Sequence, residues 1–345
     1  MGAQSSEAAP ASGSIVQAVY IVLGRYALVF ILVALIVGFS IAHPETFFTL
    51  RNFQAIFVNQ IVVVFAAVGL VAPLIVGELD LSVGFLVGFA QALVVGLMTM
   101  QGFPIPLAII ATLAICAVVG AINGLLVARV GINSLIATLA TGNVLYGLVL
   151  WYTQGTVLFQ GVPRSFLAIS GGALAGVPLA ILYGVVLVLV AEIALRFLPV
   201  GRRIYAVGGN RRAALLTGIP VNAMIVGAFV FTGVVCAMGG VIIASRLGSA
   251  QPELGPQYLL PAFSAAFLGA TTIRPGRFNP LGTVVAVYTI AVIVAGLQQI
   301  GVPYWAEYVV YGIALVSGVA LSLHLTRLRD RRARRDQLEA FAESR

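Results

Sequence analysis

The stretch IVVVFAAVGLVAPLIV, from Ile61 to Val76, decides the fold class of this chain. It is apolar throughout, and a second, almost wholly apolar run extends from Leu179 to Leu195. The strands of a membrane barrel alternate apolar and polar residues, which neither run does. Backbone groups inside lipid must be hydrogen-bonded within the protein, and a helix achieves this by itself. The two runs therefore predict an all-α polytopic membrane protein.

The composition extends this prediction to the whole chain. The 345 residues are 61% hydrophobic and 9% charged, against roughly 25% charged in a soluble domain. So much apolar surface would aggregate in water, which makes lipid the expected solvent. One crossing takes about 20 apolar residues, and we expect about ten transmembrane helices. They lie approximately at Arg25–Ala42, Gln54–Val76, Ser82–Met100, Ile105–Ala128, Ser134–Tyr152, Pro178–Leu198, Ala223–Ser245, Tyr258–Thr272, Leu281–Gln298 and Trp305–Leu325. The eighth is short, and we interpret it as a broken or tilted segment.

The arginines predict the orientation in the membrane. All 19 basic residues are arginine; with the N-terminus in the cytoplasm, 16 lie on that side and only Arg51, Arg164 and Arg246 lie outside. Cytoplasmic loops carry the excess of basic residues, so both termini are expected in the cytoplasm. Five spans then end outside and five return, as a 5+5 inverted repeat requires. The repeat is a hypothesis that rests on this count.

The same patterns divide the chain and exclude several functions. We expect a disordered cytoplasmic tail at 1–20, a membrane domain at 21–326 with a cytoplasmic loop at 199–222, and a basic cytoplasmic tail at 327–345. A P-loop needs a lysine, and the chain has none, so any ATP and Mg²⁺ must bind to a partner. The basic residues form short clusters between apolar runs, which argues against a nucleic-acid partner. No catalytic triad, metal cluster or cofactor motif is present, so we predict no enzyme activity and no cofactor.

Glu78 and Asp80, in the stretch Gly77–Gly84, place two carboxylates at a membrane boundary. Such charges are costly there unless they are capped, paired or hydrated. Asp80 is placed to cap the following helix by accepting an amide hydrogen from Ser82 or Val83. A role in the transport pathway or its gating, and a proton relay, are the alternatives.

Asn210 and Gly218 bracket a short cytoplasmic helix. Asn210 is a favourable N-cap and Gly218 a favourable C′ residue, with seven residues between them. So short a helix is marginal alone in water and is stabilised by docking to a partner. It would present Ala214, Leu215 and nearby arginines. An ordinary basic loop explains the pattern equally well.

Glycine and proline are dense from Ser249 to Thr283, which favours non-helical breaks between short helices. At membrane depth such breaks are tolerated where they are buried in protein or line water. Tight glycine packing is the alternative interpretation.

These segments together resemble the permease subunits of bacterial ribose-type ABC sugar importers. The resemblance covers about residues 50–320. Four motifs occur in the same order: Gly77–Gly84, the Asn123-Gly124 pair followed by Ile136–Leu139, Gly201–Asn210, and Leu268–Thr283. Departures from the usual pattern are Glu78, Arg211, Arg212, Ala270 and Pro275.

The resemblance implies a ten-span permease that works as a pair, with an ATP-binding subunit of tandem domains inside and a periplasmic substrate-binding protein outside. It also implies that Asn210–Thr217 is the coupling helix. The coupling residues are then Gly208, Gly209, Asn210, Arg211, Ala214, Leu215 and Gly218, and the pathway or gating candidates are Glu78, Asp80, Ser82, Asn123 and Thr138.

The predicted function is import of a sugar or polyol across the bacterial inner membrane, driven by ATP hydrolysis in the partner. A same-family importer of a nucleoside or another small polar solute is one alternative. A proton-coupled secondary transporter that uses Glu78 and Asp80 is another.

Overall fold

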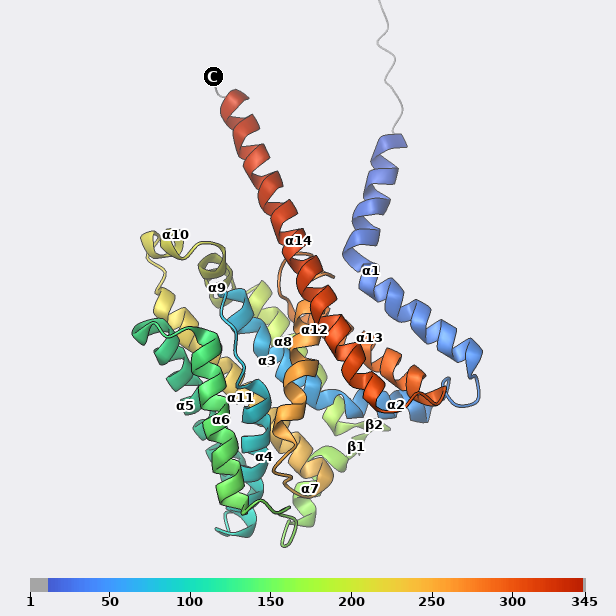
Figure 1. Cartoon of the computed structure of the whole chain (residues 1–345), viewed down its shortest axis with the longest axis vertical. Helices are drawn as coiled ribbons and strands as arrows, with labels where there is room; N and C mark the ends of the chain where they lie inside the picture. The colour runs from blue at the N-terminus through green and yellow to red at the C-terminus, as the bar shows by residue number, and fades with distance from the viewer. Residues whose placement is uncertain (1–11, 344–345) are drawn as a thin grey trace, which may run out of the picture.

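A computed structural model of the chain describes residues 12–343, and the surroundings of side chains for residues 25–325 (Figure 1). The α-helices are α1 (Ser12–Ala42), α2 (Leu50–Asn59), α3 (Ile61–Ile75), α4 (Val83–Thr99), α5 (Ile105–Leu125), α6 (Ser134–Thr153), α7 (Arg164–Gly171), α8 (Leu179–Arg196), α9 (Pro199–Gly209), α10 (Arg211–Leu216), α11 (Val221–Leu247), α12 (Leu259–Gly269), α13 (Pro280–Gln299) and α14 (Trp305–Glu343). A π-helical turn, η1 (Leu126–Val130), extends α5, and a 3₁₀ turn, η2 (Gly255–Tyr258), precedes α12. Strands β1 (Ala173–Leu174) and β2 (Val177–Pro178) form a small antiparallel hairpin. Of the expected N-terminal tail, residues 1–11 lie outside the described part and 12–20 belong to α1.

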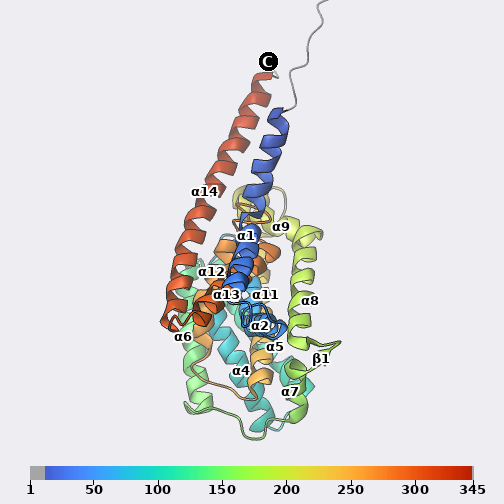
Figure 2. The ribbon, with the colours of Figure 1, turned by 90° about the vertical axis from the view of Figure 1, so that its right-hand side faces the viewer.

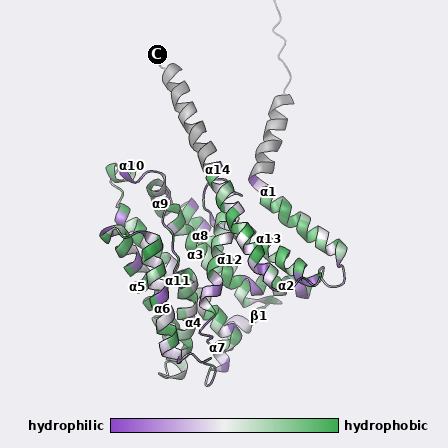
Figure 3. Ribbon diagram, viewed as in Figure 1, coloured by the Kyte–Doolittle hydropathy of each residue, from purple (hydrophilic) through white to green (hydrophobic). Residues whose placement is uncertain are grey.

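Seven of the described helices are long and apolar enough to cross a membrane, or eight if α2 and α3 form one span bent by 43°. Figure 3 shows the apolar residues along them. Each of the ten predicted segments coincides with a helix or with a broken pair of helices. However, α4 has 17 residues, at the lower limit for a crossing, and α12 has only 11, too few for a full crossing on its own. The count of ten spans is therefore not confirmed.

Helix α3 lies at the centre of the bundle, and all of its 15 residues are buried. Helix α11 packs against α3, α4 and α5, while α12 packs against α3, α13 and α14. The contact of α5 with α11 is close because it is built on glycine: a Cβ on Gly120 would lie 2.3 Å from the carbonyl oxygen of Phe229. Small residues of this kind let membrane helices approach each other. Cys116 and Cys236 are free and buried in this region, where they pack within the apolar core.

The two ends of the molecule differ. Figures 1 and 2 show α9 and the C-terminal part of α14 toward one end and α7 toward the other. Figure 1 places α10 beside α9. The short cytoplasmic helix predicted from the sequence and the chain's C-terminal helix thus lie toward the same end.

Candidate functional site

Residues 76–82, which we call the unwound segment, connect α3 to α4 without helical structure. Figure 1 shows the chain leaving α3 next to α9 and running to the start of α4. At Gly77 the backbone adopts φ +83°, which glycine accommodates readily. The segment is buried at several positions, so its backbone polar groups need partners inside the protein.

Helix α6 supplies those partners through two hydroxyls. Ser134 Oγ accepts from the amide of Leu79 at 3.2 Å, and Thr138 Oγ1 accepts from the amide of Leu81 at 2.9 Å. An extended chain advances about 6.6 Å over two residues, and a helix advances about 6 Å over four residues. Hydroxyls one helical turn apart are therefore spaced to meet alternate amides of the segment.

Asp80 sits at the start of α4 in a buried polar cluster. Its Oδ1 accepts from the amide of Ser82 at 2.9 Å and from Ser82 Oγ at 2.5 Å. Asn123 on α5 donates from Nδ2 to Ser82 Oγ at 3.1 Å. All three side chains are fully buried. The predicted bond between Asp80 and the amide of Ser82 is confirmed, although the N-cap position itself is occupied by Ser82.

The structure thus brings all five pathway candidates together along the unwound segment: Glu78, Asp80, Ser82, Asn123 and Thr138. Sequence reasoning missed Ser134, which carries the second hydroxyl. Its spacing of four residues from Thr138 was the available signal, since residues i and i+4 share one face of a helix.

The predicted short helix is α10. Asn210 Oδ1 accepts from the amide of Ala213 at 3.0 Å, which confirms it as the N-cap. At the other end Gly218 has φ +80°, and Ile219 donates its amide to Ala214 O at 3.0 Å. Both ends are therefore closed as the sequence predicted, around a helix of six residues.

The exposed face of α10 differs from the predicted one. Ala214 is only 4% exposed and packs inward, so it does not present itself to a partner. Leu215, at 64%, and Leu216, at 88%, are exposed. Arg211, Arg212 and Ala213 are exposed as well, so the predicted exposure of Leu215 and the nearby arginines is confirmed. The prediction for Ala214 was wrong because orientation depends on how α10 sits on α9 and α11, which the local pattern does not contain. Leu216 was missed for the same reason.

Helix α9 touches the junction between α3 and the unwound segment through its backbone. A Cβ on Gly208 would lie 1.7 Å from the carbonyl oxygen of Ile75, the last residue of α3. Gly209, by contrast, has open space around it. Only a glycine at position 208 permits this approach.

Arg211 makes a second connection between the same elements. Its Nη2 donates to Val76 O at 2.9 Å and to Glu78 Oε1 at 2.5 Å. The side chain of Glu78 is 11% exposed and that of Arg211 47%. Arginine at a helix N-terminus is electrostatically unfavourable, and this bond to a carboxylate offsets the cost. Glu78 and Arg211, two of the residues that depart from the usual family motifs, therefore form an ion pair with each other.

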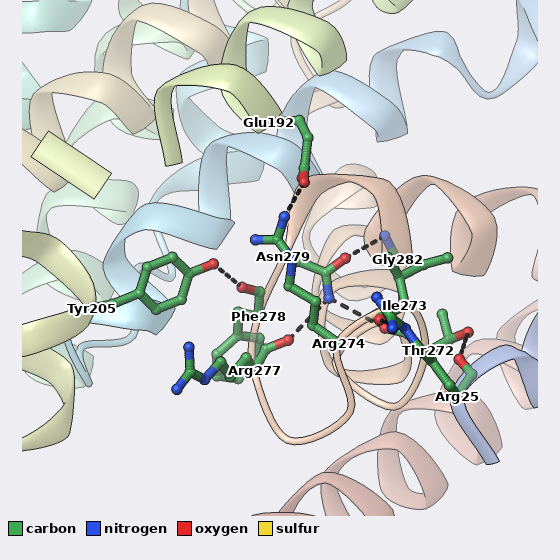
Figure 4. Close-up of polar contacts among 10 residues, drawn as sticks. All are labelled: Arg25, Glu192, Tyr205, Thr272, Ile273, Arg274, Arg277, Phe278, Asn279 and Gly282. Carbon is green, nitrogen blue, oxygen red and sulfur yellow. Dashed lines mark hydrogen bonds and ion pairs between the residues drawn. The ribbon is translucent and has the colours of Figure 1, made fainter. Parts of the chain in front are cut away.

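The loop from Ala270 to Asn279 is held by a third set of polar contacts (Figure 4). Buried Asn279 caps α13 by accepting from the amide of Gly282 at 2.7 Å, and its Nδ2 donates to Thr272 O at 3.3 Å. Tyr205 on α9 donates its hydroxyl to Phe278 O at 2.7 Å. Burial raises the pKa of Tyr205, which keeps this hydroxyl protonated as a donor. The expected non-helical break in this region is confirmed.

One ion pair and two hydrogen bonds to the backbone of Ile273 tie that loop to the rest of the bundle (Figure 4). Arg274 pairs with Glu192 on α8. Ile273 donates its amide to Arg25 O at 2.9 Å and accepts from Arg25 Nε at 2.7 Å. Ile273 has φ +60°, which is strained for a β-branched residue, and the double contact with α1 holds it there.

Comparison with known proteins identifies the family. The family model described as "Branched-chain amino acid transport system / permease component" matches residues 52–317. The ribose import permease of Bacillus subtilis strain 168 is 35% identical over 300 residues, covering 87% of this chain and 92% of that protein. The autoinducer 2 import system permease of Escherichia coli K12 is 32% identical over 284 residues (79% and 86%), and its D-allose transport system permease is 29% identical over 297 residues (86% and 91%). No solved structure matches the chain significantly. The chain therefore belongs to this family of transport-system permease components, and it is a multi-pass membrane permease rather than an enzyme.

Proposed function

We propose that this chain is the permease subunit of an ATP-driven ABC importer that moves a sugar or polyol across the bacterial inner membrane. Its similarity to permeases named for ribose, D-allose and autoinducer 2 supports the substrate class. The substrate arrives from a periplasmic binding protein, and ATP is hydrolysed by a cytoplasmic subunit with tandem ATP-binding domains. The observation that carries the proposal is α10, a capped helix with two exposed leucines that is bonded to the unwound segment.

Helix α10 is the docking element in this proposal. Leu215 and Leu216 present apolar side chains on a six-residue helix that is closed at both ends. Exposed apolar residues in an aqueous loop favour burial against another protein. The cytoplasmic placement of α10 rests on the arginine distribution, and the position of the chain's C-terminal helix toward the same end supports it.

The route from α10 to the pathway consists of contacts already described. Gly208 abuts Ile75, and Arg211 bonds to Val76 and Glu78. Any displacement of α9 and α10 is therefore transmitted to the first residues of the unwound segment. The same segment leads to Asp80 and its buried partners. We infer that closure of the ATPase shifts this segment and switches access to the pathway.

The pairing of helices supports the 5+5 inverted repeat as a proposal. Helix α4 packs against α5, α6 and α11, and α12 packs against α13, α14 and α3. These two sets of neighbours correspond if the first five spans match the last five in order. In that order α4 matches α12, α5 matches α13, α6 matches α14, and the span of α2 and α3 matches α11. Both α4 and α12 are short, and each follows a break in the α-helical chain: the unwound segment before α4, and the 3₁₀ turn η2 before α12. Discontinuous helices at equivalent places in two halves are typical of transport pathways.

A second copy of the chain is the proposed neighbour of α6. Asn143 lies in the middle of α6 and is exposed, with exposed Gly147 one turn further along. An amide facing hydrocarbon is unfavourable, while a small residue beside it permits close helix contact. Cysteines at 143 or 147 should crosslink between two copies in membranes, without background from the two buried native cysteines.

The buried carboxylate of Asp80 favours a proton-coupled transporter as the second candidate function. Its Oδ2 is buried and has no hydrogen-bond partner among the described residues. A relay through Glu78 is less favoured, because that carboxylate is held by Arg211.

Reconstitution separates the two candidates. The permease is placed in proteoliposomes with and without the proposed ATP-binding subunit and the proposed binding protein. We expect uptake only with both partners and ATP. Uptake by the permease alone that an uncoupler abolishes would reject the ATP-driven proposal. The ligand of the binding protein then decides between a sugar, a polyol and a nucleoside.

A further inference from the structure

A cavity of about 440 Å³ lies where the α2–α3 bend, η2, and the adjacent ends of α13 and α14 meet. This volume is within the range of small-molecule sites. The described contacts of the unwound segment and of α10 do not involve it. In the topology predicted from the arginines, these helix ends lie on the outer side of the membrane. The cavity is therefore placed where solute would enter.

The lining of the cavity is unusually polar for a chain with 9% charged residues. It includes Gln60, Gln257, Gln298, Glu307, Tyr308 and Tyr311. Glutamine offers both donors and acceptors, and a carboxylate can accept from two hydroxyls at once. Tyrosine adds an aromatic face and a hydroxyl. This combination suits a small molecule with many hydroxyl groups.

One edge of the cavity is fixed by the bend between α2 and α3. The bend of 43° falls at Gln60, the single residue between the two helices. Arg246 holds the end of α2 by donating to Val58 O at 2.9 Å and to Asn59 Oδ1. A break of this kind within a span exposes polar groups that a continuous helix would hide. Gln60 and Asn59 are thereby held at the cavity wall.

We propose that this cavity binds one neutral sugar or polyol before it enters the pathway. The inference rests on the proposed function for its substrate class and for the outward direction of the cavity. The lining contains one carboxylate and no cationic side chain, which disfavours phosphorylated sugars and other anions. Neutral hydroxyls match the glutamines and tyrosines among the polar lining residues, and the apolar remainder of the lining can pack against the carbon skeleton of a sugar.

The chain provides a natural reporter for the test. It has two tryptophans, and Trp305 lies two residues before Glu307 on α14. A Trp151→Phe variant leaves Trp305 as the only tryptophan. This variant, in lipid nanodiscs, is titrated with D-ribose, D-allose, ribose 5-phosphate and choline while tryptophan fluorescence is recorded. We expect a saturable change with at least one neutral sugar and none with the phosphate ester or the cation.

Variants then assign the response to the cavity. Glu307→Gln should weaken sugar binding by about tenfold, since hydrogen bonds to charged groups are stronger than neutral ones. Gln160→Ala, which changes an exposed glutamine outside the cavity, should leave it unchanged. The proposal is overturned if neither sugar gives a saturable change, if Glu307→Gln binds like the parent, or if choline or ribose 5-phosphate binds as well as the sugars.

Thiol labelling gives a measurement that needs no ATPase. A Gln257→Cys variant is treated in sealed, outward-oriented vesicles with a membrane-impermeant maleimide. Both native cysteines are buried and should not react. We expect labelling that the binding sugar slows. A cysteine that reacts in detergent but not in membranes indicates that a second copy or lipid covers the cavity, and this would overturn the proposal. Sugar binding without ATP-driven uptake would instead reject only the proposed function.

Discussion

Arg211 and Glu78 lie 133 residues apart in the sequence and form an ion pair at 2.5 Å. The arginine is the first residue of α10, and the glutamate belongs to the unwound segment. The same guanidinium also binds the backbone at Val76. The pair therefore joins the surface proposed for the ATPase to the unwound segment, two residues before Asp80.

Reversing the charges of this ion pair tests whether it couples α10 to the unwound segment. Arg211→Glu places two carboxylates together, and Glu78→Arg places two arginines together. Each change should lower ATP-driven uptake by about tenfold, within the range of measured coupling energies, while ATP hydrolysis continues. Uptake and ATP hydrolysis are measured on the same proteoliposomes.

The double variant Arg211→Glu with Glu78→Arg is the matched control. It restores the attraction in the opposite sense and should recover most of the uptake. If each single variant transports normally, the pair has no role in coupling. If the double variant is no better than the singles, the residues act separately.

Gly208 and Gly209 offer a test with adjacent positions. Gly208→Ala pushes a Cβ against the carbonyl of Ile75, and the backbone shift should cost about 1–3 kcal/mol of stability. Gly209→Ala meets open space and should change stability by less than about 0.5 kcal/mol. Thermal unfolding in detergent and ATP-driven uptake measure the difference. Equal behaviour of the two variants would contradict the close approach of α9 to α3.

The hydroxyl of Thr138 should contribute more to the stability of the protein than the hydroxyl of the nearby Thr141. Thr138→Val leaves the part-buried amide of Leu81 without its acceptor, which should destabilise the protein by about 1–3 kcal/mol. Thr141→Val removes only a bond to the carbonyl of Ala137 within the same helix and should be nearly neutral. The two variants are compared by thermal unfolding. A milder effect at 138 than at 141 would argue against the role of α6 in holding the unwound segment.

Substitutions on α10 should separate docking from folding. Leu216→Asp should weaken association with the ATP-binding subunit by at least about tenfold, as expected for an apolar anchor, and leave thermal unfolding unchanged. Ala214→Asp should instead lower the unfolding temperature, because Ala214 is buried. Co-purification and thermal unfolding are measured for both. Normal co-purification of Leu216→Asp would place the docking surface elsewhere.

Much of this architecture could be predicted because its signals are local. Hydropathy located the long apolar helices of the membrane domain but not the shorter α7 and α9, and Asn210 and Gly218 marked both ends of α10. The sequence also showed that the eighth segment, which is α12, is short, whereas the 17-residue length of α4 did not stand out from the predicted segment Ser82–Met100. The capping role of Asp80 was visible because it concerns a residue two positions away.

The remaining features depend on contacts between distant segments. Glu78 and Arg211 each stood out as unusual, but their pairing follows only from the position of α9 against α3. The burial of Ala214 likewise depends on how α10 packs against α9 and α11. The cavity near Gln60 draws its polar residues from four separate parts of the chain, none of which carries a motif of its own.

The contact between Gly208 and Ile75 has a consequence for engineering. It is made largely of main-chain atoms and requires only a glycine at position 208, whereas the exposed leucines of α10 are replaceable side chains. The contact of α9 with α3 and the outward face of α10 can therefore be changed independently of each other. Grafting a different six-residue sequence between Asn210 and Thr217 should redirect the permease to another ATPase, provided that residue 211 remains arginine and residue 214 remains small.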